Sequence, residues 1–471
     1  MSKHDRRENL RLLPSVDAIL QTATAARIRR QSGAKHLTLL ARALTDALRR
    51  EMLGEPSGDK NYSREELLAE AEKNLEKLWR NERNSGLRRV INATGVIVHT
   101  NLGRAPLSDE AVKALTENAA RYCTLEYDLT TGERGRRGAR VENLLAELTG
   151  ADDALVVNNC AAAAFLVLTV LARGGEAVIS RGELVEIGGD FRIPDVLEQS
   201  GARLREVGTT NRTRVSDYER AVSENTKLIL RVHPSNYRIV GFTHAPALCE
   251  LAELAREKDI LLYEDAGSGA MFDLSRYGLT DEPVISDSIR AGADVVTFSG
   301  DKLLGGVQSG LIVGRGEVVE KIRKHPLYRA LRVDKLIYAA LEATLESFRR
   351  EAAVQEIPVL KMLSATIEQL KTRSSGFAEK LNKNRGANKD LKIEIAEGKS
   401  VVGGGSAPTA QPATILLALE HERMSAAELE ETLRFSNPPI ITRILDDVVL
   451  IDLRTVSESE EAELLEILEN I

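Results

Sequence analysis

The sequence predicts an α/β protein built on a largely parallel sheet, with a helical N-terminal module and a small C-terminal α+β domain. Between residues 150 and 315, short apolar runs rich in β-branched side chains alternate with segments of helical period. Residues 1–55 show a helical pattern alone, and the last third of the chain mixes both patterns. A chain of 471 residues has room for two or three such domains.

The N-terminal module is predicted to be helical and basic. Apolar residues recur at helical spacing from Val16 to Leu20 and again from Leu37 to Leu48. Residues 1–60 hold 12 Lys or Arg against 7 Asp or Glu, although the whole chain carries a net charge of −7. This excess indicates an anionic partner such as nucleic acid, and a solvated helix face explains it equally well. Aromatic side chains that would stack on bases are missing here, so contacts to phosphates and to shape are expected.

A linker and one further helix connect this module to the rest of the chain. Residues 54–59 have the Gly, Pro and Ser content of a linker. Ser63 and Glu66 form a capping-box pattern, which predicts the start of a helix with an apolar stripe. The predicted division of the chain is a basic helical domain, a linker helix, a large α/β domain and a small α+β domain, over residues 1–60, 61–85, 86–345 and 346–471.

The alternating region defines the predicted sheet. Its strands are separated by segments that read as helices, so both faces of the sheet should be covered. Ligands of such sheets bind beyond the carboxyl ends of the strands. The predicted strands are 154–157, 177–179, 204–207, 228–232, 260–263, 295–298 and 311–313.

Two of these strands end in a chemically complementary pair, Asp265 and Lys302. Lys302 lies in a turn of Ser and Gly residues between two apolar strands, and Asp265 closes another apolar strand. Pyridoxal 5′-phosphate enzymes need a lysine that binds the cofactor aldehyde and a carboxylate that pairs with the ring nitrogen. Such a carboxylate favours the charged ring by about 1–3 pKa units. Each residue alone would be read as an ordinary loop side chain, but together they predict this cofactor.

Further residues at the same sheet edge are predicted to bind the cofactor. An Asn-Asn-Cys-Ala-Ala-Ala run joins a strand to a helix, and the first amides of a helix are free to bind phosphate. We expect the amides near Cys160 and Ala161 to hold the cofactor phosphate, with Ser299 as a hydroxyl donor. Ser235 or Asn236, which follow another strand, should contact the cofactor ring.

Three arginines are candidates for a second anion site. Arg329 and Arg332 are spaced to share one face of a helix, and arginine is suited to bidentate contacts with phosphate. Arg104 ends an apolar run that is broken by polar residues, which are costly unless they face a site. A surface of ordinary salt bridges is the alternative interpretation.

Other functional classes are excluded by composition. Cys123, Cys160 and Cys249 are scattered, which argues against a zinc site and a disulfide framework and favours the cytosol. No apolar run approaches the roughly 20 residues that span a bilayer, so no membrane partner is expected.

Several long stretches of the sequence resemble the bacterial selenocysteine synthase family, the L-seryl-tRNA(Sec) selenium transferases. They cover nearly the whole chain. The stretches are 89–107, Leu125-Glu-Tyr-Asp128, 180–189, 207–213, Ser235-Asn-Tyr237, Phe298-Ser-Gly-Asp-Lys-Leu-Leu-Gly-Gly306 and Asp452-Leu-Arg-Thr-Val456. The sequence departs from the family pattern at Cys160, where an Asn is usual, and near Arg140, where a His is frequent.

The resemblance implies a fold, partners and site residues. The core would be of the aminotransferase-like type (fold type I), in a homo-oligomer that is typically a decamer built from dimers. The N-terminal domain would bind tRNA(Sec). Lys302 would be the cofactor lysine and Asp265 its ring partner, whereas Arg104, Arg329 and Arg332 would hold the phosphate of the selenium donor, selenophosphate.

The same resemblance implies a reaction. L-seryl-tRNA(Sec) would lose water by β-elimination to give dehydroalanyl-tRNA, and selenium from selenophosphate would then add to yield L-selenocysteinyl-tRNA(Sec). A pyridoxal phosphate lyase acting on a free amino acid or amino sugar is one alternative, although it would have no use for the basic module. A non-catalytic RNA-binding protein is another, and the intact lysine and aspartate argue against it.

Overall fold

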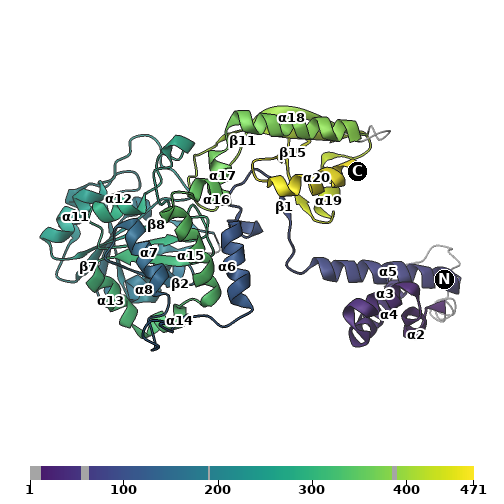
Figure 1. Cartoon of the computed structure of the whole chain (residues 1–471), viewed down its shortest axis with the longest axis horizontal. Helices are drawn as coiled ribbons and strands as arrows, with labels where there is room; N and C mark the ends of the chain where they lie inside the picture. Colours follow the sequence, from purple (N-terminus) through teal and green to yellow (C-terminus); the bar gives the residue numbers. More distant parts are fainter. Residues whose placement is uncertain (1–11, 55–62, 189–190, 385–389) are drawn as a thin grey trace. The chain divides into compact units, whose positions relative to one another are not determined.

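The computed structural model describes residues 12–54, 63–188, 191–384 and 390–471. The chain divides into two compact units, residues 1–89 and 90–471 (Figure 1). Beyond Gly54, the predicted linker lies outside the described residues. The finer division into four segments stays a prediction.

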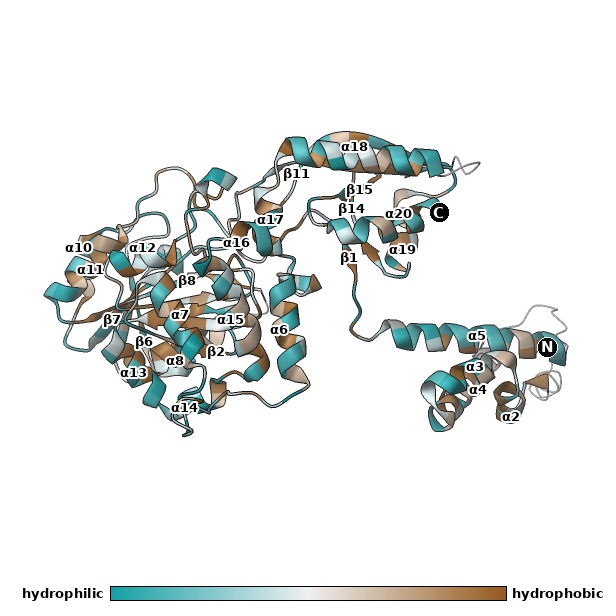
Figure 2. Cartoon of the chain, viewed as in Figure 1, coloured by the Kyte–Doolittle hydropathy of each residue, from teal (hydrophilic) through white to brown (hydrophobic). Residues whose placement is uncertain are grey.

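The first unit is a helical module whose described helices share one core. Ser15 and Thr22 accept hydrogen bonds from the first turns of two helices, and the predicted capping box of Ser63 and Glu66 is confirmed. The helix that was expected to act as a linker contributes Ala71 and Leu75 to this core. Figure 2 shows hydrophilic colour dominating the length of that helix, as its exposed face requires. The helices are α2 (Val16–Leu20), α3 (Ala23–Ser32), α4 (Ala34–Gly54) and α5 (Arg64–Asn84).

A seven-stranded sheet forms the centre of the second unit, and all seven predicted strands are confirmed. The strand order is β2-β10-β9-β8-β7-β3-β6. β10 alone runs opposite to the other six strands. Residues 300–309 join it to β9, and this connection is shorter than the crossover of about a dozen residues or more that two parallel strands need. The strands are β2 (Asp153–Val157), β3 (Glu176–Ser180), β6 (Arg203–Val207), β7 (Thr226–Val232), β8 (Leu261–Gly267), β9 (Val295–Ser299) and β10 (Gly310–Gly314).

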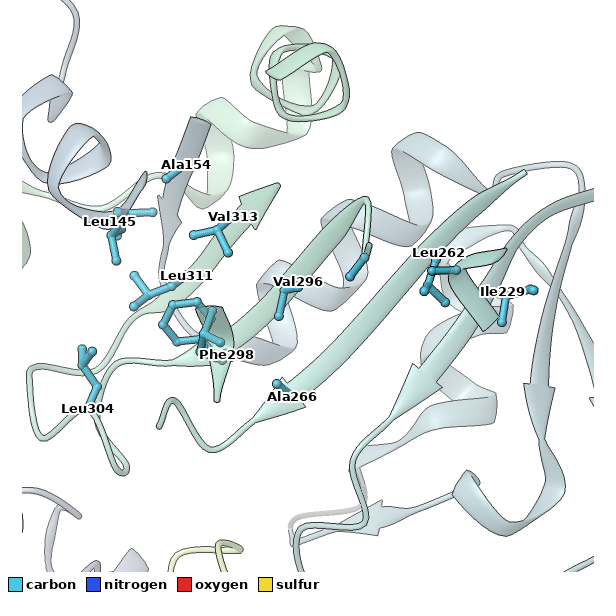
Figure 3. Packing of buried hydrophobic residues seen from close by; sticks show 14 of the residues in the cluster. Leu145, Ala154, Ile229, Leu262, Ala266, Val296, Phe298, Leu304, Leu311 and Val313 are labelled. Atoms are coloured by element: carbon cyan, nitrogen blue, oxygen red, sulfur yellow. The ribbon is translucent and has the colours of Figure 1, made fainter. Parts of the chain in front are cut away.

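Apolar clusters cover both faces of this sheet. On one face, Phe298, Leu311 and Val296 pack against helices that include α7 (Ala139–Thr149) and α15 (Lys335–Arg349) (Figure 3). The opposite face is covered by α8 (Cys160–Leu171), α9 (Ile193–Ser200) and α13 (Gly316–Lys324). Strands buried on both sides are continuously apolar, which is why they could be predicted without alternation.

The last third of the chain builds a four-stranded antiparallel sheet in the order β11-β12-β15-β14. The mixture of helices and strands that the sequence predicts for this region is confirmed. Among the described residues, no helix is both long and apolar enough to cross a membrane. The elements are α18 (Ile367–Asn384), β11 (Leu391–Lys399), β12 (Ala413–His421), α19 (Ala426–Arg434), β14 (Arg443–Leu445), β15 (Val448–Asp452) and α20 (Glu461–Glu469).

Candidate active site

Asp265, Lys302 and Cys160 lie at one end of the large sheet. Asp265 is near the end of β8, Lys302 is in the turn after β9, and Cys160 is the first residue of α8, just beyond β2. These three strands run in the same direction, so their carboxyl ends share one edge. Asp265 is 7% exposed and Lys302 is 5% exposed. Two buried groups of opposite charge at this edge are the arrangement that the sequence predicted.

Asp265 accepts two hydrogen bonds on one carboxylate oxygen. The hydroxyl of Thr297 donates to Oδ1 over 3.0 Å, and the thiol of Cys160 donates to the same atom over 3.5 Å. Thr297 is the direct neighbour of Asp265 on the adjacent strand β9. Burial raises the pKa of Asp265, and the donated hydrogen bonds and the nearby Lys302 oppose that rise.

Lys302 meets a glycine-rich segment from the C-terminal part of the unit. Its Nζ donates to the carbonyl of Gly405 over 3.2 Å. Residues 403–405 are consecutive glycines that all have positive φ, and a Cβ at Gly404 would lie 2.5 Å from Val98 Cγ1. Only glycine combines this backbone with so close an approach. The segment is therefore shaped to bring a main-chain carbonyl to the buried amine.

The first turn of α8 offers amides to an anion. Asn159 caps the helix by accepting from Ala162 N over 2.8 Å, whereas the amides of Cys160 and Ala161 donate to no group in the described parts of the chain. Ser299 is buried and interacts with the Cys160 thiol. Burial also raises the pKa of that thiol, so it is a neutral donor and a poor nucleophile.

Of the two residues expected at the cofactor ring, Ser235 is better placed than Asn236. Asn236 is exposed, and its Nδ2 donates to the carbonyl of Glu186 over 2.8 Å. Ser235 is 2% exposed, and its Oγ lies 3.9 Å from the position that a Cβ of Gly405 would take. Gly405 also contacts Lys302, so Ser235 belongs to this group.

Arg104 is held beside the lysine by an acidic residue that the sequence reading did not single out. Its Nη1 lies 2.8 Å from Oδ2 of Asp301, the residue that precedes Lys302, and Asp301 is 4% exposed. Arg104 also has a φ of 65°, which few non-glycine residues adopt. The pair ties the segment near residue 104 to the turn that carries Lys302.

The other two arginines do not share a helix face, which corrects the expectation from their spacing. Arg329 lies in α14 (Pro326–Leu331), where it is exposed and has no ion-pair partner among the described residues. Arg332 ends that helix in an extended conformation, because its backbone pairs with Val157 at the end of β2. Its Nη1 lies 3.7 Å from Glu126 Oε1. Arg332 thus lies beside the strand that leads to Cys160.

Sequence reasoning missed four parts of this site. Thr297 and Tyr263, whose hydroxyls lie 2.8 Å apart, were visible only as strand residues, although Tyr263 and Asp265 are two apart and so project from the same face. Asp301 was hidden in the motif around Lys302. The glycine run at 403–405 lies in no predicted element, and its one signal in the sequence is three adjacent residues that tolerate positive φ.

The described part of the chain offers no set of ligands for a metal ion. No three His, Cys, Asp or Glu side chains in those ranges are grouped to hold an ion. The site instead combines an amine, a carboxylate and free amides, which suits a cofactor that carries an aldehyde, a basic ring nitrogen and a phosphate.

Comparison with known proteins agrees with this chemistry. Residues 90–457 match the family model described as L-seryl-tRNA selenium transferase. The L-seryl-tRNA(Sec) selenium transferase of Alkaliphilus metalliredigens is 52% identical over 386 residues, which cover 82% of each chain. The enzyme of that name from Clostridium perfringens strain 13 is 46% identical over 456 residues, which cover 96% of each chain.

A solved structure supports the fold. The chain is similar to D-glucosaminate-6-phosphate ammonia-lyase with a TM-score of 0.57 and 21% identity, over 83% of this chain and 97% of the other. The second unit thus has the aminotransferase-like core of fold type I that was expected. The extent of the family match and the identity of the relatives together show that this chain belongs to the L-seryl-tRNA selenium transferase family.

Proposed function

We propose that the protein converts L-seryl-tRNA(Sec) into L-selenocysteinyl-tRNA(Sec) with pyridoxal 5′-phosphate as cofactor. The seryl group would lose water to give dehydroalanyl-tRNA, and selenophosphate would supply the selenium that adds to it. The observation that carries the proposal is the pair of buried groups, Lys302 and Asp265, at the carboxyl edge of the sheet. Family membership adds independent support.

The residues present fit the cofactor at three points. Lys302 supplies the amine for the cofactor aldehyde, and Asp265 supplies a carboxylate for the ring nitrogen. The free amides of Cys160 and Ala161, with the hydroxyl of Ser299, suit the phosphate. When bound, the cofactor supplies an electron sink that stabilises negative charge at the substrate's α-carbon.

Lys302 has a second task in this proposal. Its Nζ would take the proton from the α-carbon of the seryl group and so act as a general base. The carbonyl of Gly405 accepts from that amine over 3.2 Å and so orients it. Asp265 holds the proton on the ring nitrogen while the negative charge develops.

The arginines are proposed to bind the phosphate group of selenophosphate. Arg104 lies next to the lysine through Asp301, and Arg332 lies beside the end of β2 that leads to α8. Arg329 is exposed on the helix before Arg332 and has no acidic partner in the described ranges. Guanidinium groups suit this ligand because they bind two phosphate oxygens at once.

The helical module is proposed to bind the tRNA. Four exposed cations, Arg29, Arg30, Lys35 and Arg42, have no carboxylate partner in the described part of the module. Arg27, in contrast, is ion-paired with Glu76. Unpaired cations remain free to neutralise phosphates, which is the main source of affinity for nucleic acid.

We also propose that the protein works in the cytoplasm as a homo-oligomer, a decamer built from dimers. Val240, Phe242 and Tyr122 are 86%, 91% and 105% exposed, and solvated apolar side chains of this size suit a contact between subunits. Sedimentation analysis of the purified protein would measure the assembly, and a monomer would overturn this part of the proposal.

The test of the function is the visible absorption spectrum of the purified protein. We expect a band from the lysine-bound cofactor that changes on addition of seryl-tRNA(Sec) and not on addition of free serine. Lys302→Ala should lose the band and all turnover, while Lys321→Ala, at an exposed position of α13, should keep both. A response to serine instead would favour a lyase for small substrates, and the absence of any band would refute the cofactor assignment.

A further inference from the structure

A chain of buried hydrogen bonds ends on the carboxylate of Asp265. The hydroxyls of Tyr263 and Thr297 lie 2.8 Å apart, and Thr297 donates in turn to Asp265 Oδ1 over 3.0 Å. Cys160 donates to the same oxygen over 3.5 Å. Tyr263 and Thr297 are fully buried, and neither residue acts in the proposed reaction.

The direction of these hydrogen bonds follows from counting the protons that each hydroxyl can donate. A threonine hydroxyl has one proton, and Thr297 gives it to Asp265, because an ionised carboxylate can only accept. Thr297 must therefore accept from Tyr263. Burial raises the pKa of Tyr263, so its phenol keeps the proton that it donates. The order is Tyr263 to Thr297 to Asp265.

The two donors share one oxygen and leave the other without a partner. Both Thr297 and Cys160 donate to Oδ1, and in the described ranges no group donates to Oδ2. Oδ2 is not among the buried polar atoms that lack a partner, and Asp265 is 7% exposed, so this oxygen remains open to a donor carried by a ligand. The protonated ring nitrogen of the proposed cofactor would donate to Oδ2. In the described ranges, no group of the protein does so.

We propose that Thr297, supported by Tyr263, and Cys160 are positioning residues that keep Asp265 ionised and reserve its Oδ2 for the ring nitrogen of the cofactor. This inference rests on the proposed function, because it assumes that pyridoxal phosphate occupies the site. It explains why a hydroxyl and a thiol point at an aspartate from two different elements, β9 and α8. Removing either donor makes the carboxylate a stronger base, so the shared proton moves from the ring toward Asp265.

The experiment measures the protonation of the ring nitrogen directly. Holoenzyme loaded with cofactor labelled with ¹⁵N in the ring is compared by solid-state NMR for wild type, Thr297→Val and Cys160→Ala. We expect each variant to move the ring signal toward that of a neutral pyridine, and the double variant to move it further. Cofactor affinity should fall about 10-fold to 100-fold for each lost hydrogen bond to the charged group.

Conservative variants separate positioning from packing. Thr297→Ser and Cys160→Ser keep a donor at each position and should restore the wild-type signal. Thr149→Val removes the hydroxyl of an equally buried threonine, which donates to Leu145 O over 2.6 Å in α7, and should leave the signal unchanged.

The outcomes distinguish this inference from the function on which it rests. A wild type that binds no cofactor overturns the proposed function and this inference together. A wild type that binds the cofactor with an unprotonated ring nitrogen overturns the inference alone. So does a protonated nitrogen whose signal and cofactor affinity are the same in wild type and in the Thr297→Val and Cys160→Ala variants.

Discussion

Gly310 provides the sharpest test of how the sheet supports the proposed phosphate site. It is the first residue of β10, paired with Val157 on one side and Ser299 on the other. A Cβ added at this position would lie 2.0 Å from the carbonyl oxygen of Asn159 and 2.9 Å from the amide nitrogen of Cys160. Both are backbone atoms, so Gly310→Ala cannot be accommodated by turning a side chain.

The expected cost follows from that overlap. Real Cβ contacts are essentially never shorter than 3.0 Å, so the backbone at Asn159 must retreat by about 1 Å. Overpacking of this kind costs about 1–3 kcal/mol in stability. The movement displaces the amides that begin α8, and a shift of about 1 Å in a binding group can cost as much as 100-fold. We therefore expect both a less stable second unit and a large loss of cofactor affinity.

The assay can observe the two units separately. Trp79 is the single tryptophan of the chain and belongs to the first unit. In urea unfolding of Gly310→Ala, its fluorescence should report an unchanged transition, while the circular dichroism of the sheet-containing unit should shift to lower urea. Equilibrium dialysis against pyridoxal phosphate should show the loss of affinity.

A second glycine supplies the control. Gly376 lies inside α18, and a Cβ there would meet nothing within 4 Å. Gly376→Ala should be neutral or stabilise by about 0.5–1 kcal/mol and leave cofactor affinity unchanged. A Gly310→Ala protein that matched wild type in both measurements would refute the close approach of β10 to the start of α8.

Three further predictions concern stability and RNA binding. The carboxylate of Asp452 is fully buried and accepts three hydrogen bonds. Asp452→Ala should cost about 3–5 kcal/mol, measured by urea unfolding, because it leaves the buried guanidinium of Arg454 without the carboxylate that stabilises its charge. Burial raises the pKa of Glu183 from 4.5 to about 7, so the native state binds the extra proton and is favoured by about 3 kcal/mol below pH 4.5. That stability should be lost as the pH rises to 7, and Glu183→Gln should flatten the dependence in unfolding curves recorded across this window. Arg29→Gln should weaken tRNA binding and reduce its salt dependence by about one phosphate contact, measured by filter binding, whereas Arg27→Gln, at an ion-paired position, should change little.

Most strands of the large sheet could be predicted because they are apolar on both faces and their turns are rich in glycine, whereas the edge strand β6 keeps only Leu204 and Val207 as apolar residues. The same reasoning missed β11, in which only the first residue of nine is fully buried. An edge strand of this kind has no apolar run to detect, and it is held by its pairing with β12. Local pattern also placed Arg329 and Arg332 on one helix, whereas the bridge between Arg332 and Val157 ends the helix one residue earlier.

At the site, the reactive groups could be predicted from the sequence, but the residues that hold them in place could not. Lys302 and Asp265 could be inferred because each closes an apolar strand, and strand ends of a parallel sheet meet at one edge. Thr297 could not, because its role depends on the register that sets it beside Asp265. Asp301 and Arg104 are 197 positions apart, so their contact needs the folded chain.

The glycine run at 403–405 shows why the C-terminal part of the second unit is needed at the site. The amides of Ile97 and Val98 donate to the carbonyls of Val401 and Val402 over 2.9 and 2.7 Å, which fixes the entry to the run. The amide of Ala407 donates to the carboxylate of Glu282 over 2.5 Å, which fixes the exit from the run. Between these anchors, positive φ at all three glycines turns the Gly405 carbonyl toward Lys302. A residue with a Cβ at 403 or 404 would collide with Val96 or Val98, so the carbonyl would move and the buried amine would lose an acceptor. The position of the reactive amine thus depends on backbone that lies about a hundred residues further along the chain.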